Sequence, residues 1–189
     1  MEGVKLSDIP QELFESISRH IANYTVGFVR PDETTSSADV LLLGSGTFVE
    51  INGVYGILTA HHVIEVLLKC GEEIGLILSP NLPTLHSPKI RSKFFTPVKV
   101  ARGKVASEGP DLGVVVLPSV TLGSIKALKS FYNLGLRCDQ VLRNPPGNDM
   151  GIWFLCGFID EFTIEDPPTQ GYARVKGFHC RCGPVLGVS

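Results

Sequence analysis

Two adjacent histidines stand where a strand-like run of the sequence meets a helix-like one. His61 and His62 follow the apolar run at residues 54–59, and the stretch after them has helical spacing. A histidine at a strand end, partly shielded from water and facing a cleft, is suited to act as a general base because its pKa lies near neutrality. The alternative is a pair of histidines at a helix start, one exposed and the other satisfied by local hydrogen bonds.

An aspartate 49 positions after His62 is the residue most suited to orient such a base. Asp111 opens an almost wholly apolar run that ends at Pro118. A carboxylate at the edge of a core needs a hydrogen-bond donor, and an imidazole N–H supplies one in catalytic pairs. The alternative is an aspartate that merely starts a strand from a Pro-Asp-Leu-Gly turn. The two interpretations differ in whether Asp111 meets His62.

The elements that must position these residues are mostly short strands. After about residue 22 the chain is a succession of runs rich in Val, Ile, Thr and Phe, each closed by Gly, Pro, Asn or Asp. Asn52 and Gly53 between two such runs predict a tight hairpin. We expect strands at residues 24–30, 40–43, 46–51, 54–59, 74–79, 98–105, 112–117, 151–159, 173–178 and 184–188. Such a series favours an all-β sandwich or barrel over a parallel α/β sheet.

Three helices are expected beside the strands. The first follows a cap at Ser7 or Asp8 and has Pro10 in its first turn. Its apolar face at helical spacing consists of Ile9, Leu13, Phe14, Ile17 and Ile21. The other two helices are expected at residues 61–69 and 119–131.

Three segments together resemble the trypsin-like (chymotrypsin-fold) serine peptidase family. They are Gly-Ser-Gly-Thr-Phe at residues 44–48, Ile-Leu-Thr-Ala-His-His-Val at residues 57–63 and Asp-Leu-Gly-Val-Val at residues 111–115. The resemblance implies an all-β fold of two antiparallel β-barrels packed across a cleft. It also implies that His62 is the general base and Asp111 the acid that orients it. Gly113 stands where the family usually has alanine.

The resemblance covers the chain from about residue 24 to its end. A further segment, Trp-Phe-Leu-Cys-Gly-Phe at residues 153–158, is similar to a second-lobe strand. Residues 1–23 would then be an N-terminal helical extension, with lobe 1 at about residues 24–118 and lobe 2 at about residues 132–189. We expect an incomplete second barrel, because the family continues beyond this point. A fragment of a longer chain, or a reading frame altered near residue 179, would both explain the early end.

The nucleophile motif departs from the family. Where the family has Gly-x-Ser-Gly-Gly-Pro, this chain has His-Cys-Arg-Cys-Gly-Pro at residues 179–184. Arg181 therefore occupies the serine position, and a guanidinium cannot be deprotonated to attack a carbonyl. His179 and Cys182 replace glycines that let the backbone turn around the developing oxyanion, and Gly183 is the one glycine of the motif that is kept, followed by Pro184.

Three functions stay open on these residues. The first is a serine endopeptidase-like hydrolase, inactive as a pseudoenzyme because the serine is absent. The second is a cysteine peptidase that uses Cys182, aligned by a one-residue slip. The third is a non-catalytic module that grips an extended peptide by strand addition. No cofactor or metal is expected, since Cys-x-Cys beside His179 poorly matches the ligand spacing of zinc sites.

The composition narrows the class of partner. The 189 residues include 17 Lys+Arg against 19 Asp+Glu, so we expect a peptide or protein substrate rather than nucleic acid or an anionic membrane. No run approaches the ~18 consecutive apolar residues of a membrane span, and the acidic start is unlike a signal peptide. We therefore expect a cytoplasmic protein. Five cysteines without regular spacing favour reduced thiols; the oligomeric state is not indicated.

Overall fold

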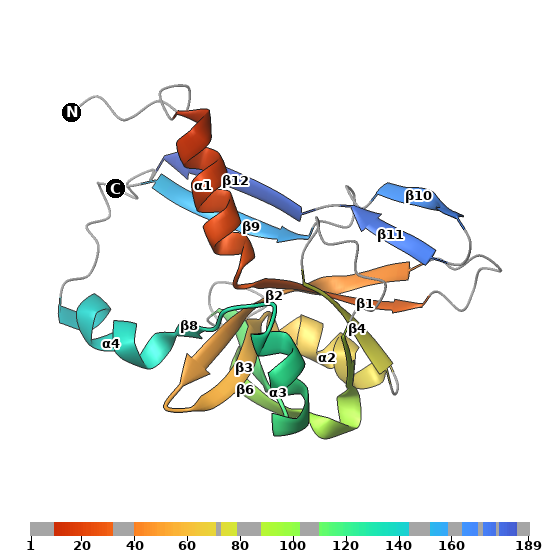
Figure 1. Ribbon diagram of the computed structural model, residues 1–189. Coiled ribbons are helices and arrows are strands. Elements are labelled where there is room, and N and C mark those ends of the chain that lie inside the picture. Colours follow the sequence, from red (N-terminus) through yellow and green to blue (C-terminus); the bar gives the residue numbers. More distant parts are fainter. Residues whose placement is uncertain are drawn as a thin grey trace.

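The computed structural model describes residues 10–31, 40–70, 73–78, 88–102, 110–143, 152–158, 164–169, 172–176 and 178–184. These residues are mostly β, with a curled antiparallel sheet and a few helices (Figure 1). The helices are α1 (Gln11–Ala22), α2 (His61–Lys69), α3 (Ser119–Lys126) and α4 (Leu134–Arg143), with a 3₁₀ turn at Ser92–Phe94. Within the described ranges, no helix combines the length and the apolar character that crossing a membrane requires.

Seven strands form the main path of the curled sheet, in the order β5-β4-β1-β2-β3-β7-β6, and β8 pairs with β2. Their bounds are β1 (Thr25–Pro31), β2 (Val40–Ile51), β3 (Val54–Thr59), β4 (Glu73–Ile77), β5 (Lys89–Arg91), β6 (Thr96–Arg102), β7 (Asp111–Val116) and β8 (Tyr132–Asn133). The two end strands, β5 and β6, are consecutive in the chain. Seven flat strands would separate them by about 29 Å. The chain from Arg91 to Thr96 reaches at most about 18 Å, so the sheet has to curl.

The hairpin between β2 and β3 is confirmed. Ile51 pairs with Val54, and both turn residues have positive φ, 50° at Asn52 and 82° at Gly53. A two-residue turn with two positive φ angles matches the twist of the flanking strands, and Asn-Gly adopts it at low cost. The backbone N–H of Gly53 also donates to Glu50 Oε1 at 2.6 Å. This hairpin leads directly into the helix that carries the two histidines.

The core of the curled sheet lies on its concave side. Its fully buried side chains include Phe28, Phe48, Ile57, Ile64, Leu67 and Val115. α2 packs against β7, and a Cβ at Gly113 would lie 2.5 Å from Ile64 Cδ1. Glycine at this position therefore allows the close approach of helix and strand, which gives a physical reason for the departure from alanine.

Several expected elements have different bounds. β2 is one strand through residues 40–51 rather than two, and it passes Gly44 with φ 149° where its register against β1 shifts. The helix expected at residues 119–131 ends at Lys126. α2 has the bounds expected for it. α1 begins at Gln11 with Pro10 as its N-cap, so the expectations that Ser7 or Asp8 caps this helix and that Pro10 lies in its first turn are wrong. Sequence reasoning missed α4, β5, β8, β10 and β12, and the strand expected at residues 184–188 lies outside the described residues except for Pro184.

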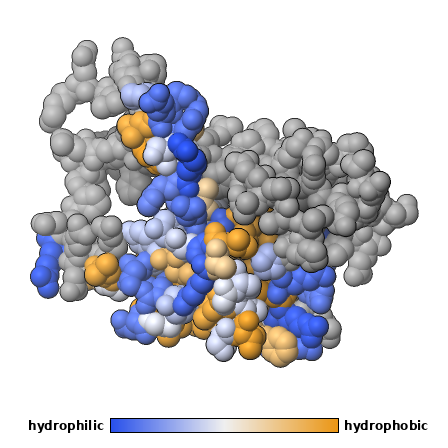
Figure 2. Space-filling view, viewed as in Figure 1, coloured by the Kyte–Doolittle hydropathy of each residue, from blue (hydrophilic) through white to orange (hydrophobic). Residues whose placement is uncertain are grey.

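Beyond the curled sheet the described residues form two separate strand pairs. β9 (Ile152–Phe158) pairs with β12 (Phe178–Pro184), and β10 (Ile164–Thr169) pairs with β11 (Tyr172–Lys176). In Figure 1, β9 and β12 lie beside α1 and above β1. A hydrophilic face of α1 is directed outward (Figure 2). Within the described ranges no second barrel is closed, so the two-barrel arrangement stays a prediction.

Candidate active site

His62 is held at the junction of a strand and a helix. β3 ends at Thr59, Ala60 is the N-cap of α2, and His62 is the second residue of the helix. Thr59 is 5 % exposed, and its Oγ1 donates to the carbonyl oxygen of Ser45 at 2.7 Å. The junction is therefore fixed to β2 both by the strand ladder and by a side chain.

The structure brings His62 and Asp111 together. His62 Nδ1 and Asp111 Oδ2 form a close hydrogen bond, and the backbone N–H of His62 donates to Asp111 Oδ1 at 3.2 Å. The His62 side chain is 61 % exposed and that of Asp111 is 26 % exposed. Both carboxylate oxygens are thus occupied by one residue, which fixes the plane of the imidazole ring.

Asp111 also serves as a cap for α2. Ala60 has no side chain that could satisfy the free N–H groups of the first helical turn, and Asp111 accepts one of them from across the sheet. A carboxylate at a helix N-terminus is further favoured by the helix dipole. The Asp111 side chain therefore both caps α2 and orients the His62 ring.

The electrostatics keep Asp111 ionised. The hydrogen bond from the His62 side chain is the largest cause that lowers the pKa of Asp111, and burial opposes it only in part. An ionised carboxylate is only an acceptor, so Nδ1 of His62 carries the proton and the lone pair is on Nε2. Among the described residues, nothing forms a hydrogen bond with Nε2. Nε2 of His62 can therefore accept a proton from a group that approaches the ring.

His61 has the opposite environment. It is 5 % exposed, and its Nε2 lies 3.3 Å from Glu65 Oε1 one helical turn later. Its Nδ1 is buried without a hydrogen-bond partner in the described part of the chain. A buried ring that already serves its own helix is poorly placed to meet a substrate, so His62 is the candidate base of the two.

The residues expected at the nucleophile and the oxyanion hole lie in β12. Arg181, Cys182 and Gly183 pair with Leu155, Phe154 and Trp153 in an unbroken antiparallel register. Their side chains lie outside the described part of the structure, so their role at His62 stays a prediction. The regular strand differs from the sharp turn that a Gly-x-Ser-Gly-Gly loop would need to direct consecutive N–H groups at one oxygen.

The cysteines correct one expectation. Cys156 in β9 is disulfide-bonded, whereas Cys70 and Cys138 are free. The expectation of five reduced thiols is therefore wrong. No sign of this bond is present in the sequence. Which cysteine lies opposite Cys156 becomes clear only when the pairing register of β9 and β12 is known. In that register Cys180 stands opposite Cys156.

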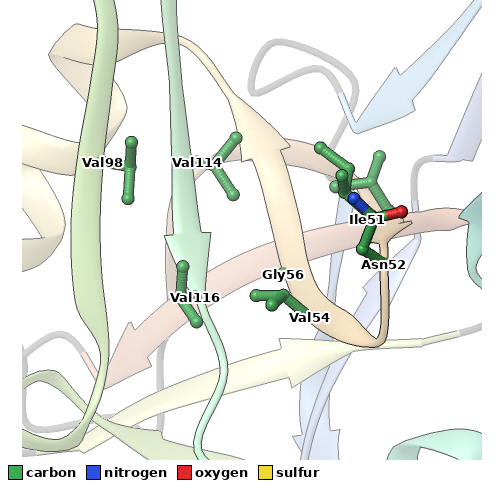
Figure 3. A pocket seen from close by; sticks show the side chains of 8 residues that line it. Ile51, Asn52, Val54, Gly56, Val98, Val114 and Val116 are labelled. Carbon is green, nitrogen blue, oxygen red and sulfur yellow. The ribbon is translucent and has the colours of Figure 1, made fainter. Parts of the chain in front are cut away.

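A hollow of about 350 Å³ lies on the other face of the curled sheet (Figure 3). It is lined by Val49, Ile51, Asn52, Val54, Gly56, Val98, Val114 and Val116. These positions alternate along the strands with core residues such as Ile57 and Val115, so the hollow faces away from the core. It contains no titratable side chain and does not belong to the pair of His62 and Asp111. The described residues also hold no cluster of three or more metal-ligating side chains.

Comparison of the chain with protein-family models, with curated proteins and with solved structures found no match. The functional interpretation therefore rests on the geometry around His62 and on the sequence segments that resemble the trypsin-like family.

Proposed function

We propose that this chain is a serine endopeptidase-like protein in which His62 is the general base and Asp111 orients it. The observation that carries the proposal is the pair of hydrogen bonds from His62 to the Asp111 carboxylate. The proposed architecture places this pair, which we call the dyad, on one barrel that faces a second barrel across a cleft. β9 and β12 would belong to that second barrel.

The dyad supplies the proton transfers of acyl transfer to a peptide bond. Nε2 of His62 takes the proton of an attacking hydroxyl as its oxygen adds to the carbonyl carbon. The imidazolium returns that proton to the leaving amine when the C–N bond breaks. Asp111 stays ionised throughout and stabilises the imidazolium. Since Arg181 occupies the serine position, the chain lacks this hydroxyl and is proposed to be inactive in its given form.

A second candidate function is peptide binding without cleavage. It is favoured by the regular pairing of β12 with β9 through Arg181, Cys182 and Gly183. A strand in this position offers ladder hydrogen bonds to an extended peptide instead of a nucleophile. The dyad would then be a retained part of the scaffold.

A labelling experiment tests the proposal. The chain itself should not react with a fluorophosphonate, whereas a variant with His179→Gly, Arg181→Ser and Cys182→Gly, which restores Gly-x-Ser-Gly-Gly, should be labelled. Adding His62→Ala should abolish labelling, and adding His20→Ala, an exposed histidine in α1, should not. A restored variant that folds and is not labelled would contradict the assignment of the dyad.

A thiol probe separates the cysteine alternative. If Cys182 is a nucleophile activated by His62, an activity-directed thiol reagent should modify it at neutral pH, and His62→Ala should suppress the reaction. Equal reactivity of Cys182 in both chains would exclude this alternative and leave the peptide-binding module as the second candidate.

A further inference from the structure

One hydroxyl connects β9 to the curled sheet. Ser45 Oγ accepts the backbone N–H of Phe158 at 2.8 Å and donates to the carbonyl oxygen of the same residue at 3.1 Å. The two residues are 113 positions apart in the chain. A side chain here satisfies both main-chain groups of a strand residue, which is otherwise the task of a neighbouring strand.

The same serine is fixed on its other side to the strand that leads to the dyad. Its carbonyl oxygen accepts the hydrogen bond from Thr59 Oγ1 at 2.7 Å. Thr59 pairs with Gly46 and stands three positions before His62. Two side-chain hydrogen bonds therefore lead from Phe158 in β9 to the end of β3, from which the helix that carries His62 begins.

Packing holds the same contact in place. Phe158 is 7 % exposed and packs with Val29, Ile77 and Leu42. A Cβ at Gly27 would lie 2.8 Å from Cδ2 of the Phe158 ring, and a Cβ at Gly157 would lie 3.4 Å from Ser45 Oγ. Gly27 therefore allows an approach that a side chain would prevent, whereas a Cβ at Gly157 would make an ordinary van der Waals contact. We call Ser45, Thr59, Phe158 and Gly27 the joint.

We propose that Ser45 is a positioning residue that fixes the placement of β9 and β12 relative to His62. The inference rests on the proposed function and names the residue that aligns its two halves. β12 pairs with β9 over its whole length, from Phe178 opposite Phe158 to Pro184 opposite Ile152. A shift of Phe158 is thus transmitted to Arg181, the position of the nucleophile in the family.

The first test measures the joint without reference to activity. In Ser45→Ala the backbone amide of Phe158 should exchange with deuterium at least about tenfold faster, because its hydrogen bond to Ser45 Oγ is lost. Residual dipolar couplings of β3 and β9 amides should fit one alignment tensor in the wild-type chain and require two in Ser45→Ala. Ser124→Ala, which removes one exposed hydroxyl bond within α3, is the matched control and should change neither quantity. Unchanged exchange and a single tensor in Ser45→Ala would overturn the proposal.

A conservative pair separates positioning from general stability. Thr59→Ser keeps the hydroxyl that reaches Ser45, and Thr59→Val keeps the volume without it. The proposal expects a single tensor in Thr59→Ser and two tensors in Thr59→Val, with the Nδ1 proton resonance of His62 present in both. The same orientation in both variants would show that Thr59 acts only by packing and would contradict the proposed link.

The second test uses the chain in which Gly-x-Ser-Gly-Gly has been restored. There, Ser45→Ala should reduce the rate of fluorophosphonate labelling about tenfold while the Nδ1 resonance of His62 persists. If Ser45→Ala requires two alignment tensors but is labelled by the fluorophosphonate at an unchanged rate, the positioning role is overturned. If the restored chain is not labelled at all, the proposed function fails, and the exchange and tensor measurements still decide whether Ser45 places β9.

Discussion

The curled sheet and the β9–β12 pair are both antiparallel, but different forces hold them together. The curled sheet buries large side chains such as Phe28, Phe48 and Ile57 completely. The β9–β12 pair is a two-stranded ribbon, and its described contacts are the hydrogen bonds of Phe158 to Ser45, the packing of Phe158 against Val29, Ile77 and Leu42, and the disulfide of Cys156. Two-stranded ribbons alone are marginally stable in water. The proposed general base thus lies on a sheet with an extensive buried core, and residues 179–183 lie in a ribbon whose described contacts with that sheet centre on Phe158.

This difference affects which of the two regions, the curled sheet or the β9–β12 pair, tolerates substitutions. In the curled sheet, packing restricts which residue types fit near the dyad. A Cβ at Gly113, for example, would lie 2.5 Å from Ile64 Cδ1. Backbone pairing in β12 places fewer demands on residue type, because ladder hydrogen bonds use main-chain atoms. The sequence at residues 179–183 is therefore compatible with the pairing of β12 with β9.

The largest effect is expected from the core of the curled sheet. Phe48→Ala removes a fully buried ring and should reduce the free energy of unfolding by about 3–5 kcal/mol. Phe94→Ala, at a ring that is 55 % exposed, should change it by less than about 0.5 kcal/mol. Urea denaturation followed by circular dichroism measures both. Similar losses in the two variants would contradict burial as the main force in this region.

The disulfide of Cys156 should stabilise the β9–β12 pair and not the curled sheet. Cys156→Ser is expected to cost about 2–4 kcal/mol of local stability, measured by hydrogen exchange of β9 amides, and to leave exchange in β3 unchanged. Cys70→Ser, at a free thiol, is the control. Mass spectrometry of the non-reduced chain should find Cys156 linked to Cys180, its opposite in the register. A link to Cys182 would show that the register is displaced by two residues.

The glycine behind the dyad offers a smaller test. Gly113→Ala should destabilise the chain by about 1–3 kcal/mol, since the new Cβ would lie 2.5 Å from Ile64 Cδ1. Ile64→Val removes that methyl group and should restore part of the loss when combined with Gly113→Ala. Gly123→Ala, in α3 with open space around it, should be neutral or stabilising. Denaturation midpoints of the four chains show whether the loss of stability comes from the contact with Ile64 or from the backbone.

Asp111 makes the stability of the dyad region depend on pH. Because the pKa of Asp111 is lowered in the folded chain, its stabilisation is complete above the unfolded value of about 3.9 and is lost as the pH falls below it. Asp111→Asn keeps an oxygen for the N–H of His62 but removes this dependence. Unfolding free energies of both chains between pH 3 and pH 6 should converge at the acidic end. Parallel curves would mean that the carboxylate contributes no charge-dependent stability.

A further pH effect concerns the contact that ties α1 to the segment that follows α3. Lys129 is buried, its Nζ donates to the carbonyl oxygen of Ala22 at 2.6 Å, and burial lowers its pKa to about 8. The folded chain therefore loses this proton before the unfolded chain does, and stability should rise between pH 8 and about 10.4. Lys129→Met should lack this rise in urea denaturation. An equal slope in both chains would assign it to other groups.

Features set by neighbouring residues could be predicted from the sequence. The Asn52-Gly53 turn and the bounds of α2 follow from local backbone preferences, and both agree with the structure. The meeting of His62 with Asp111 was anticipated as one of two alternatives, from residue types and from a resemblance in spacing. Its catalytic role stays a prediction.

Features set by tertiary pairing could not be predicted in this way. The continuity of β2 through Gly44 depends on a register shift against β1, which no local pattern encodes. Ser45 and Phe158 are joined by hydroxyl bonds across the fold, and a serine in a Gly-Ser-Gly run gives no sign of such a distant partner. The disulfide of Cys156 was missed for the same reason.

The pairing of β3 with β7 has a consequence for how the chain is made. Asp111 stands at the start of β7 and reaches His62 only after β7 has added to β3, whose Thr59 pairs with Gly113. During synthesis, a ribosome-bound chain that has not yet exposed residue 111 holds an imidazole without its carboxylate. The imidazole therefore acquires this orientation only after β7 has paired with β3, and not at the moment its own helix forms.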